Sequence, residues 1–289
     1  MDVRVTSLDL GSHAGRTLLR QIEYYYDTVP RAGASVEDFG PLTLFVRHGR
    51  GWPFYARPTL GWSGPVPAVD VMAVRSRQRE LGLPESFEWV AETTPTLRAA
   101  IEEAGLVVRE HPLMVLEPHA PVPSASPLPA GVSVRMVAAD DPVLPGALAV
   151  PHLAFAQAGT GIGAVGVAEL ADTVRARAGD GSVERAAARI RSGRTAISAA
   201  VTDAAVLSAG QHQPVGAVTE IVGVGTLPAA RRRGLGLAVT AALVRDARSR
   251  GVATVFLSAG DDDIARIYAR LGFRRFATAL IAEPRTGRG

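Results

Sequence analysis

A cluster of arginines and glycines stands where a predicted helix begins, in the run 231–236, which reads Arg-Arg-Arg-Gly-Leu-Gly. The mostly apolar run 217–226 is typical of a strand, and residues 235–250 repeat apolar side chains with helical spacing. The first turn of a helix has unpaired backbone N–H groups and carries the positive end of the helix dipole. Glycine lets an anion approach that backbone, and arginine pairs with phosphate oxygens. The pattern therefore predicts a pyrophosphate site.

Two other interpretations of the same run remain open at this point. One is a surface turn with a solvated basic patch. The other is a dinucleotide loop, because Gly234-x-Gly236 opens a helix and Asp261 follows the next strand. That fit is poor, since the third glycine position holds Val239 and the first glycine lies several residues beyond the strand.

Two residue types are absent from the sequence. The chain has no cysteine, and its 31 basic residues are all arginine. Without cysteine there is no disulfide, thiolate metal site or cysteine nucleophile. Without lysine there is no Walker-type phosphate loop, kinase ATP site or pyridoxal Schiff base. The histidines are dispersed and show no metal-ligand spacing, so we expect no bound metal and none of these cofactor classes.

Charge and hydropathy bear on the protein's location and partners. The net charge is +3, and no basic block with interleaved aromatics occurs beyond Arg231–Arg233, so we expect no nucleic-acid partner. No apolar run approaches the length of a membrane span, and the N-terminus lacks the pattern of a signal peptide. We expect a cytoplasmic protein with no membrane partner.

The proline-rich run 117–131 predicts an extended connector between two domains. We expect domains at 1–118 and 131–289, with a linker at 119–130. Both halves end in a similar order, with Ala104-Gly105-Leu106 before the last strand of one and Leu271-Gly272-Phe273 before that of the other, which suggests an old duplication. The expected strands are 42–46, 53–57, 86–90, 107–116, 131–137, 195–202, 206–210, 217–226, 253–257 and 275–282, and the expected helices are 68–81, 94–104, 142–157, 167–178, 182–192, 235–250 and 263–271.

The loop and one later stretch together resemble a known family. Arg231, Gly234 and Gly236 match, position by position, the Arg/Gln-x-x-Gly-x-Gly/Ala loop that binds acetyl-CoA in GCN5-related N-acetyltransferases (GNATs). The run 268–273, Tyr-Ala-Arg-Leu-Gly-Phe, resembles the family's Tyr-x-x-x-Gly-Phe, one helix and one strand later. The resemblance implies an α+β fold with two GNAT-type domains, each a mostly antiparallel sheet flanked by helices. In the first half the run 60–67, Leu-Gly-Trp-Ser-Gly-Pro-Val-Pro, has no such loop, which implies a degenerate domain.

The resemblance also implies an activity and a site. It implies an N-acetyltransferase in which an amine attacks the thioester of acetyl-CoA directly, with one group as base and another as acid. The strand before the loop would bind pantetheine and the loop amides would bind pyrophosphate. The coenzyme-binding residues carried over are Val224, Gly225, Thr226, Arg231, Arg232, Arg233, Gly234, Leu235, Gly236, Leu237 and Ala238.

Two side chains are candidates for the proton transfers. Tyr268 matches the family tyrosine and would be the acid, although it lies on the apolar side of its helix and could be simple core. Glu220 would be the base. Strand alternation puts it on one face with Val222, Val224 and Thr226, and the alternative is a solvent-facing carboxylate at a sheet edge. His212 is expected in a turn, where it could line the acceptor pocket. Asp261 replaces a common family asparagine but can still cap a helix.

An acyltransferase is thus the first functional hypothesis, with acetyl-CoA as cosubstrate and an amine, on a small molecule or a protein, as acceptor. The alternative is a non-catalytic acyl-CoA-binding sensor or interaction module, which needs the same loop but neither Glu220 nor Tyr268. The oligomeric state is left open, with a homodimer among the alternatives.

Overall fold

The computed structural model describes residues 9–49, 51–117, 127–157 and 159–285. The chain forms two compact units and passes between them more than once. The first unit runs to Met114 and also takes in Ser258–Ala265 and the stretch from Arg275 onward, whereas the second comprises Val115–Leu257 and Arg266–Arg274. This division differs from a single cut at the predicted linker, of which residues 119–126 lie outside the described residues.

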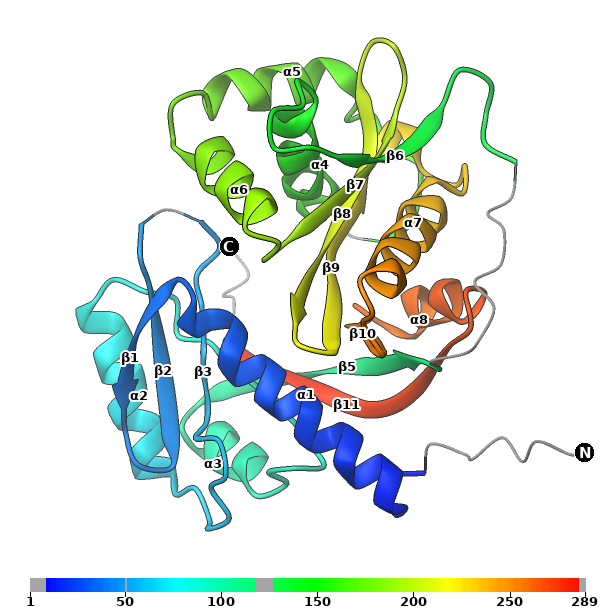
Figure 1. Cartoon of the computed structure of the whole chain (residues 1–289). Coiled ribbons are helices and arrows are strands. Elements are labelled where there is room, and N and C mark those ends of the chain that lie inside the picture. The colour runs from blue at the N-terminus through cyan, green and yellow to red at the C-terminus, as the bar shows by residue number, and fades with distance from the viewer. Residues whose placement is uncertain (1–8, 50, 118–126, 158, 286–289) are drawn as a thin grey trace, which may run out of the picture. The chain divides into compact units, whose positions relative to one another are not determined.

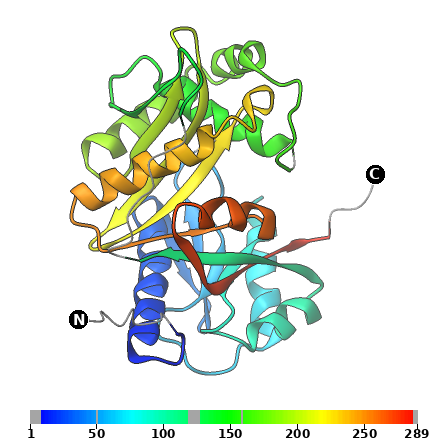
Figure 2. The ribbon, with the colours of Figure 1, turned by 90° about the vertical axis from the view of Figure 1, so that its right-hand side faces the viewer.

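The sheet of the first unit has the strand order β1-β2-β3-β4-β11-β5. The last strand of the chain belongs to it because β11 pairs antiparallel with β4, from Ala279↔Val90 to Ala282↔Phe87. Helix α1 lies on one side of this sheet, and α2 and α3 lie on the other (Figure 2). The elements are α1 (His13–Arg31), β1 (Ala34–Asp38), β2 (Leu42–Arg47), β3 (Ala56–Pro58), α2 (Ala68–Glu80), β4 (Phe87–Val90), α3 (Leu97–Glu103), β5 (Leu106–Leu116) and β11 (Phe273–Pro284).

The sheet of the second unit has the strand order β10-β9-β8-β7-β6. Helix α4 packs on β8 and β9 from one side, with α5 and α6 beside it, and α7 packs on β6 to β9 from the other (Figure 1). The elements are β6 (Ser133–Val137), α4 (Leu144–Ala156), α5 (Val167–Ala176), α6 (Ser182–Arg191), β7 (Ala196–Val201), β8 (Val206–Val215), β9 (Val218–Thr226), α7 (Leu235–Ser249) and β10 (Thr254–Ser258). Helix α8 (Asp262–Ala269) is divided between the units, since its residues up to Ala265 belong to the first and those from Arg266 to the second. A short 3-10 turn, η1, covers Pro228–Ala230.

Both halves end with the same order of main elements, since β1-β2-β3-α2-β4-α3-β5 corresponds to β7-β8-β9-α7-β10-α8-β11. In each, two parallel strands are joined by one helix: β3 and β4 by α2, and β9 and β10 by α7. The strand pairs β1–β2, β2–β3, β4–β11, β6–β7, β7–β8 and β8–β9 are antiparallel. The predicted α+β architecture, with a mostly antiparallel sheet and flanking helices, is confirmed.

Three local expectations were wrong. Residues before 42 carry α1 and β1, which were not predicted although Leu18, Ile22 and Tyr25 make a buried stripe with helical spacing. Helix α3 begins after Thr96 rather than Thr94. Strand β8 extends to Val215, since its second half keeps pairing with β9.

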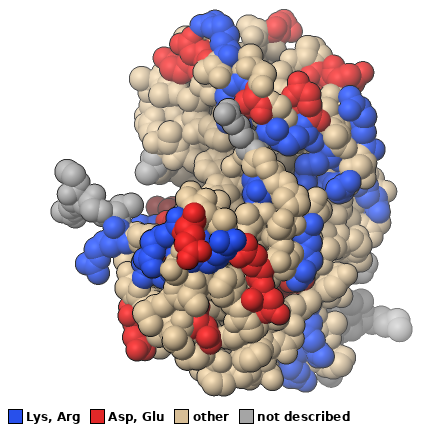
Figure 3. All heavy atoms as spheres, turned by 90° about the vertical axis from the view of Figure 1, so that its left-hand side faces the viewer, with Lys and Arg blue, Asp and Glu red and all other residues tan. Residues whose placement is uncertain are grey.

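Charged side chains of both signs are interspersed on the face shown in Figure 3. Many arginines contribute to ion pairs; Arg77, for example, lies 2.8 Å from Glu37. Because acidic partners offset many of the arginines, the net charge is only +3, and the arginines do not indicate a basic binding surface.

Candidate functional site

The N-terminus of α7 has the features of an anion site. Gly234 is its N-cap, in the left-handed conformation (φ 75°), and no side chain caps the helix. The first turn has no acidic residue. The amides of Leu235, Gly236 and Leu237 lie before the first α-helical hydrogen bond, which runs from the Ala238 N–H to the Gly234 carbonyl. An anion placed there would meet several donors and the positive end of the helix dipole.

Two arginines flank these amides in different ways. Arg232 has φ 60°, the positive φ of a non-glycine residue that costs energy and is concentrated at functional sites. Its Nε lies 3.4 Å from the carbonyl oxygen of Thr160. Arg233 is exposed and makes no ion pair or hydrogen bond with the described part of the chain. Its guanidinium is therefore available to a ligand.

Gly236 is not required by the packing of the protein itself. A Cβ on it would lie 3.5 Å from Thr226 Oγ1 and 3.8 Å from a Val224 methyl, which is ordinary contact. A Cβ on Gly225, by contrast, would come within 2.8 Å of Ala154 Cβ. Gly225 thus lets α4 approach β9, whereas Gly236 leaves space beside the amides that precede the first α-helical hydrogen bond. Glycine in a helix lowers its stability by up to about 1 kcal/mol relative to alanine, so the space at Gly236 is kept at the expense of the stability of α7.

The end of β9 beside this space is not paired with β10. Their parallel register runs from Thr254↔Val218 to Phe256↔Glu220 and, among the described residues, goes no further along β9. Leu227 donates its N–H to Leu207 of β8, so the neighbouring Thr226 directs its own N–H and carbonyl away from β8. The Gly225 carbonyl is already an acceptor from Ser208 Oγ at 2.7 Å. Thr226 therefore directs its backbone N–H and carbonyl to the side where the strands separate.

A β-bulge at Gly223 changes the predicted position of Glu220. In the pairing of β9 with β8, Gln211 faces Val222 and Ala209 faces Gly225, so Gly210 alone opposes two residues. Gly223 has φ 64°, as expected for a bulge of this kind. Because the extra residue reverses the alternation, Glu220 lies on the opposite face from Val224 and Thr226. The expectation that they share a face was wrong.

Glu220 lies instead among polar side chains on the α4 side of the sheet. Gln213 is its register partner on β8, and Gln211 points to the same side. Gln213 accepts from Arg189 of α6 at 3.2 Å, and Gln211 accepts from Thr195 at 3.2 Å. All three strand residues are half-buried. The carboxylate is thus neither deep in an apolar core nor at a free sheet edge.

The side chain of Arg231 does not make the coenzyme contact that was expected of it. The residue is only 9% exposed, and its guanidinium donates to three carbonyl oxygens: Ala154 at 2.8 Å, Gln157 at 2.8 Å and Gly161 at 3.1 Å. These acceptors lie at the C-terminus of α4 and just beyond it, where a positive charge is favourable. The Arg231 side chain therefore holds protein backbone and is not directed at the anion site.

Tyr268 lies on α8, and its ring packs edge-on against Phe273 at 6.1 Å between centroids. Burial raises the pKa of its hydroxyl to about 12, so the group stays protonated at neutral pH. Asp261 caps α8, as expected, through Oδ1, which accepts from the Ile264 N–H at 2.8 Å. The helix that carries Tyr268 is therefore fixed at its start.

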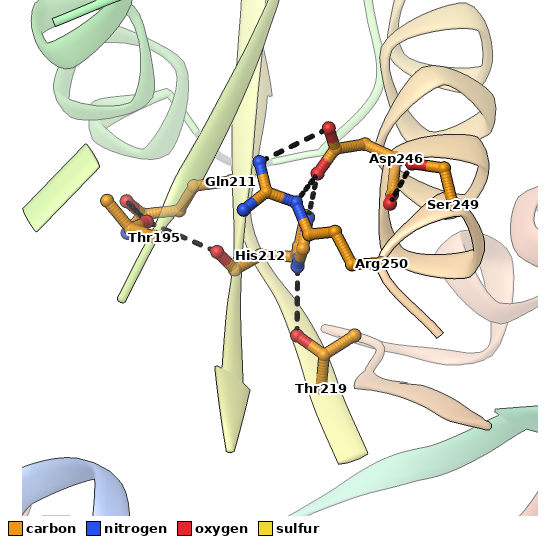
Figure 4. Close-up of polar contacts among 7 residues, drawn as sticks. All are labelled: Thr195, Gln211, His212, Thr219, Asp246, Ser249 and Arg250. Atoms are coloured by element: carbon orange, nitrogen blue, oxygen red, sulfur yellow. Dashed lines mark hydrogen bonds and ion pairs between the residues drawn. The ribbon is translucent and has the colours of Figure 1, made fainter. Parts of the chain in front are cut away.

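A buried polar network joins the middle of β8 to α7 (Figure 4). His212 is fully buried; its Nε2 lies 2.8 Å from Asp246 and its Nδ1 lies 3.0 Å from Thr219 Oγ1. Asp246 is also 2.6 Å from Arg250 Nε. Burial lowers the pKa of His212 despite Asp246, so the ring is neutral, Nε2–H donates to Asp246, and Nδ1 accepts from Thr219. The expectation that His212 occupies a turn was wrong, and it is not on the Glu220 face.

Sequence reasoning missed these polar neighbours of the site, although the signals were present. Gln211 and Gln213 alternate with His212, which in a strand assigns them to opposite faces. Gly223 inside an apolar strand is the usual sign of a bulge. No local pattern in the sequence could have predicted the hydrogen bonds of Arg231, because their acceptors lie far from it along the chain.

Comparisons with known proteins agree with the observed fold. A family model described as FR47-like protein matches residues 203–281. A GCN5-related N-acetyltransferase from Kribbella flavida has a similar structure, with TM-score 0.65 and 23% identity, covering 93% of this chain and 96% of that one. The chain has the GNAT fold. A structure described as a tandem GNAT protein from the clavulanic acid biosynthesis pathway is also similar, with TM-score 0.54 and 16% identity, covering 86% of this chain and 79% of that one.

One relative has an assigned activity. The mycothiol acetyltransferase of Parafrankia sp. (strain EAN1pec) is 42% identical over 83 residues, which make up 28% of this chain. The match spans 24% of that protein, so this chain matches about a quarter of its length. The similarity supports a shared segment and leaves the acceptor of this GNAT-fold chain to be determined.

Neither a membrane span nor a metal cluster adds to the site among the described residues. None of the helices described is both long and apolar enough to cross a bilayer. No group of three or more histidine, aspartate or glutamate side chains in the described ranges could hold a metal ion.

Proposed function

We propose that the second unit binds acetyl-CoA and transfers its acetyl group to an amine. The observation that carries this proposal is the anion site at α7, which lies beside the unpaired end of β9. We call residues 228–236 the coenzyme loop. The amides from Arg232 to Leu237 would bind the pyrophosphate together with the Arg233 guanidinium, and the Thr226 backbone would bind the pantetheine arm as an added strand does.

The chemistry assigned to the site needs two proton transfers. Glu220 would take a proton from the acceptor amine, directly or through water, and Tyr268 would donate one to the departing thiolate. The protonated state of Tyr268 at neutral pH suits a donor. Direct attack of the amine on the thioester requires no enzyme nucleophile, which is compatible with a chain that has no cysteine.

We propose that the first unit binds no coenzyme. Its helix α2 occupies the place of α7, but it begins after Pro67, which has no N–H, and has Asp70 in its first turn. A carboxylate there would repel a phosphate. One coenzyme per chain is therefore expected, and the first unit would support or shape the acceptor site.

Isothermal titration with acetyl-CoA tests the coenzyme site, with one equivalent bound as the expected result. A panel of amines, followed by the release of free thiol from acetyl-CoA, then tests catalysis. Binding without turnover on any amine would favour a non-catalytic acyl-CoA sensor. The absence of binding would refute both functions.

A further inference from the structure

The coenzyme loop is attached to the segment that connects α4 and α5. We call residues 159–166 the connecting segment. The Gly163 N–H donates to the Pro228 carbonyl at 3.1 Å, and the Ala229 N–H donates to the Val165 carbonyl at 3.0 Å. A Cβ on Gly166 would lie 3.4 Å from Ala229 Cβ. The two stretches are therefore in direct backbone contact.

Arg231 adds side-chain contacts to this attachment. It donates to Gly161 of the connecting segment and to Ala154 and Gln157 at the end of α4. A guanidinium has several donors in a rigid plane and can serve three carbonyls at once, which the single ammonium of lysine does less well. If the side chain turned toward a phosphate, three carbonyl oxygens would lose their donor. Its burial therefore fixes Arg231 in this role.

The connecting segment belongs to the side of the sheet that carries Glu220. It follows α4, whose residue Ala154 packs against Gly225 of β9 on that side. Exposed large apolar side chains of the second unit gather at this segment and its ends: Phe155 is 55% exposed, Ile162 67% and Val167 44%. An acceptor that enters on this side of the sheet past the end of α4 would meet these side chains.

We propose that Arg231 is a positioning residue that couples the two sides of the site, so that acetyl-CoA bound at the coenzyme loop fixes the conformation of the connecting segment. The inference rests on the proposed function. The coenzyme would stiffen the loop amides, and the loop passes this order to residues 159–166 through Arg231 and the two backbone hydrogen bonds. The coenzyme then prepares the acceptor side before the amine binds.

Amide hydrogen exchange on the full chain, with and without saturating acetyl-CoA, tests the coupling. In the wild type, acetyl-CoA should slow exchange at residues 159–166 by about fivefold or more, within the usual range of coupling between sites. Arg231→Gln should abolish this slowing while its affinity for acetyl-CoA, measured by titration calorimetry, stays within about threefold of the wild type. Arg231→Lys, which keeps the charge without the planar donors, should retain only part of the slowing.

Arg233→Gln is the matched control, because Arg233 is a neighbouring exposed arginine. It should weaken acetyl-CoA binding yet keep the coenzyme-dependent slowing once saturated. Exchange in β7 reports global unfolding, which acetyl-CoA slows by mass action and which the loss of the Arg231 hydrogen bonds accelerates. The effect at residues 159–166 is therefore taken relative to the change in β7, and the coupling predicts a coenzyme-dependent slowing at 159–166 beyond that change in the wild type but not in Arg231→Gln. The coupling is wrong if Arg231→Gln retains the slowing, or if the wild type binds acetyl-CoA without any slowing.

Failure of the proposed function gives a different result. If the wild type does not bind acetyl-CoA, the coupling is refuted together with that function. Exchange in the free protein still decides whether Arg231 holds the segment: it should be faster at 159–166 in Arg231→Gln and unchanged in Arg233→Gln.

Discussion

Replacement of His212 by phenylalanine tests whether the buried network holds α7 on the sheet. The ring is fully buried and bridges Thr219 and Asp246, so phenylalanine fills a similar volume but offers neither nitrogen. Because α7 begins at the coenzyme loop, a weakened attachment would also loosen the anion site. The expected outcome is a less stable second unit whose fold is retained.

The magnitude follows from the partners left behind. The fully buried Thr219 hydroxyl loses its acceptor, which costs about 1–3 kcal/mol. Asp246 loses one donor, but its side chain is 17% exposed and keeps Arg250, so this loss adds about 1 kcal/mol. The sum is about 3 kcal/mol. Adding Thr219→Val removes the orphaned hydroxyl with little change of shape, and the double variant should recover about 1 kcal/mol or more.

Amide exchange in α7 is the appropriate assay for this prediction. Trp52, Trp62 and Trp89, which are the three tryptophans of the chain, lie in the first unit, so fluorescence would not report on the second. A cost below about 0.5 kcal/mol for His212→Phe would refute the reasoning, because surface substitutions have effects of that size. A double variant no more stable than His212→Phe would show that Thr219 is not the orphaned group.

We also expect His212→Phe to change how the free energy of unfolding depends on pH. The pKa of His212 is lowered in the folded protein from 6.5, so below pH 6.5 the unfolded chain binds more protons than the folded one. This contribution to stability is full above pH 6.5 and declines as the pH falls toward the folded pKa. Acidification from pH 7 to 5 should therefore destabilise the wild type more than His212→Phe. A residual slope is expected in both, since the pKa of His152 is also lowered by burial.

Three further substitutions separate binding, catalysis and stability. Gly236→Ala should raise the stability of α7 by about 0.5–1 kcal/mol, since its Cβ fits the protein, yet weaken acetyl-CoA binding about tenfold or more in calorimetry; unchanged affinity would contradict an anion site there. Tyr268→Phe keeps the ring contact with Phe273 and should lower kcat about 100-fold at unchanged acetyl-CoA affinity, and an unchanged kcat would assign Tyr268 to the core. Glu220→Gln should lower kcat/KM about 100-fold or more with little change in melting temperature, because the side chain is half-buried; equal turnover would exclude it as the base.

Local patterns in the sequence were sufficient for most of the elements and for the glycine turn at which α7 begins. The period of apolar residues predicted α7 within one residue of its observed bounds, and the glycines at 234 and 236 marked where it begins. The apolar period and the glycine turn depend only on residues within one or two helical turns of each other along the chain. The fold class came from the resemblance of residues 231–236 and 268–273 to the two GNAT motifs.

The positions of particular side chains required the tertiary structure. Strand alternation placed Glu220 with Thr226, and a single extra residue at Gly223 reversed that assignment. A one-residue change of register moves every side chain beyond it to the other face, so local errors of this kind are large in effect. The assignment of β11 to the first unit also required the tertiary structure, since nothing in a strand's own sequence specifies its neighbour.

Arg231 shows most clearly what the sequence determined by itself and what only the structure decided. The motif identified its position in a loop that suits an anion, and that loop has the expected geometry at Gly234 and Gly236. The direction of its side chain was decided by three carbonyls from a distant helix end. A buried charge must find partners wherever the fold supplies them, and those partners are known only once the chain has folded.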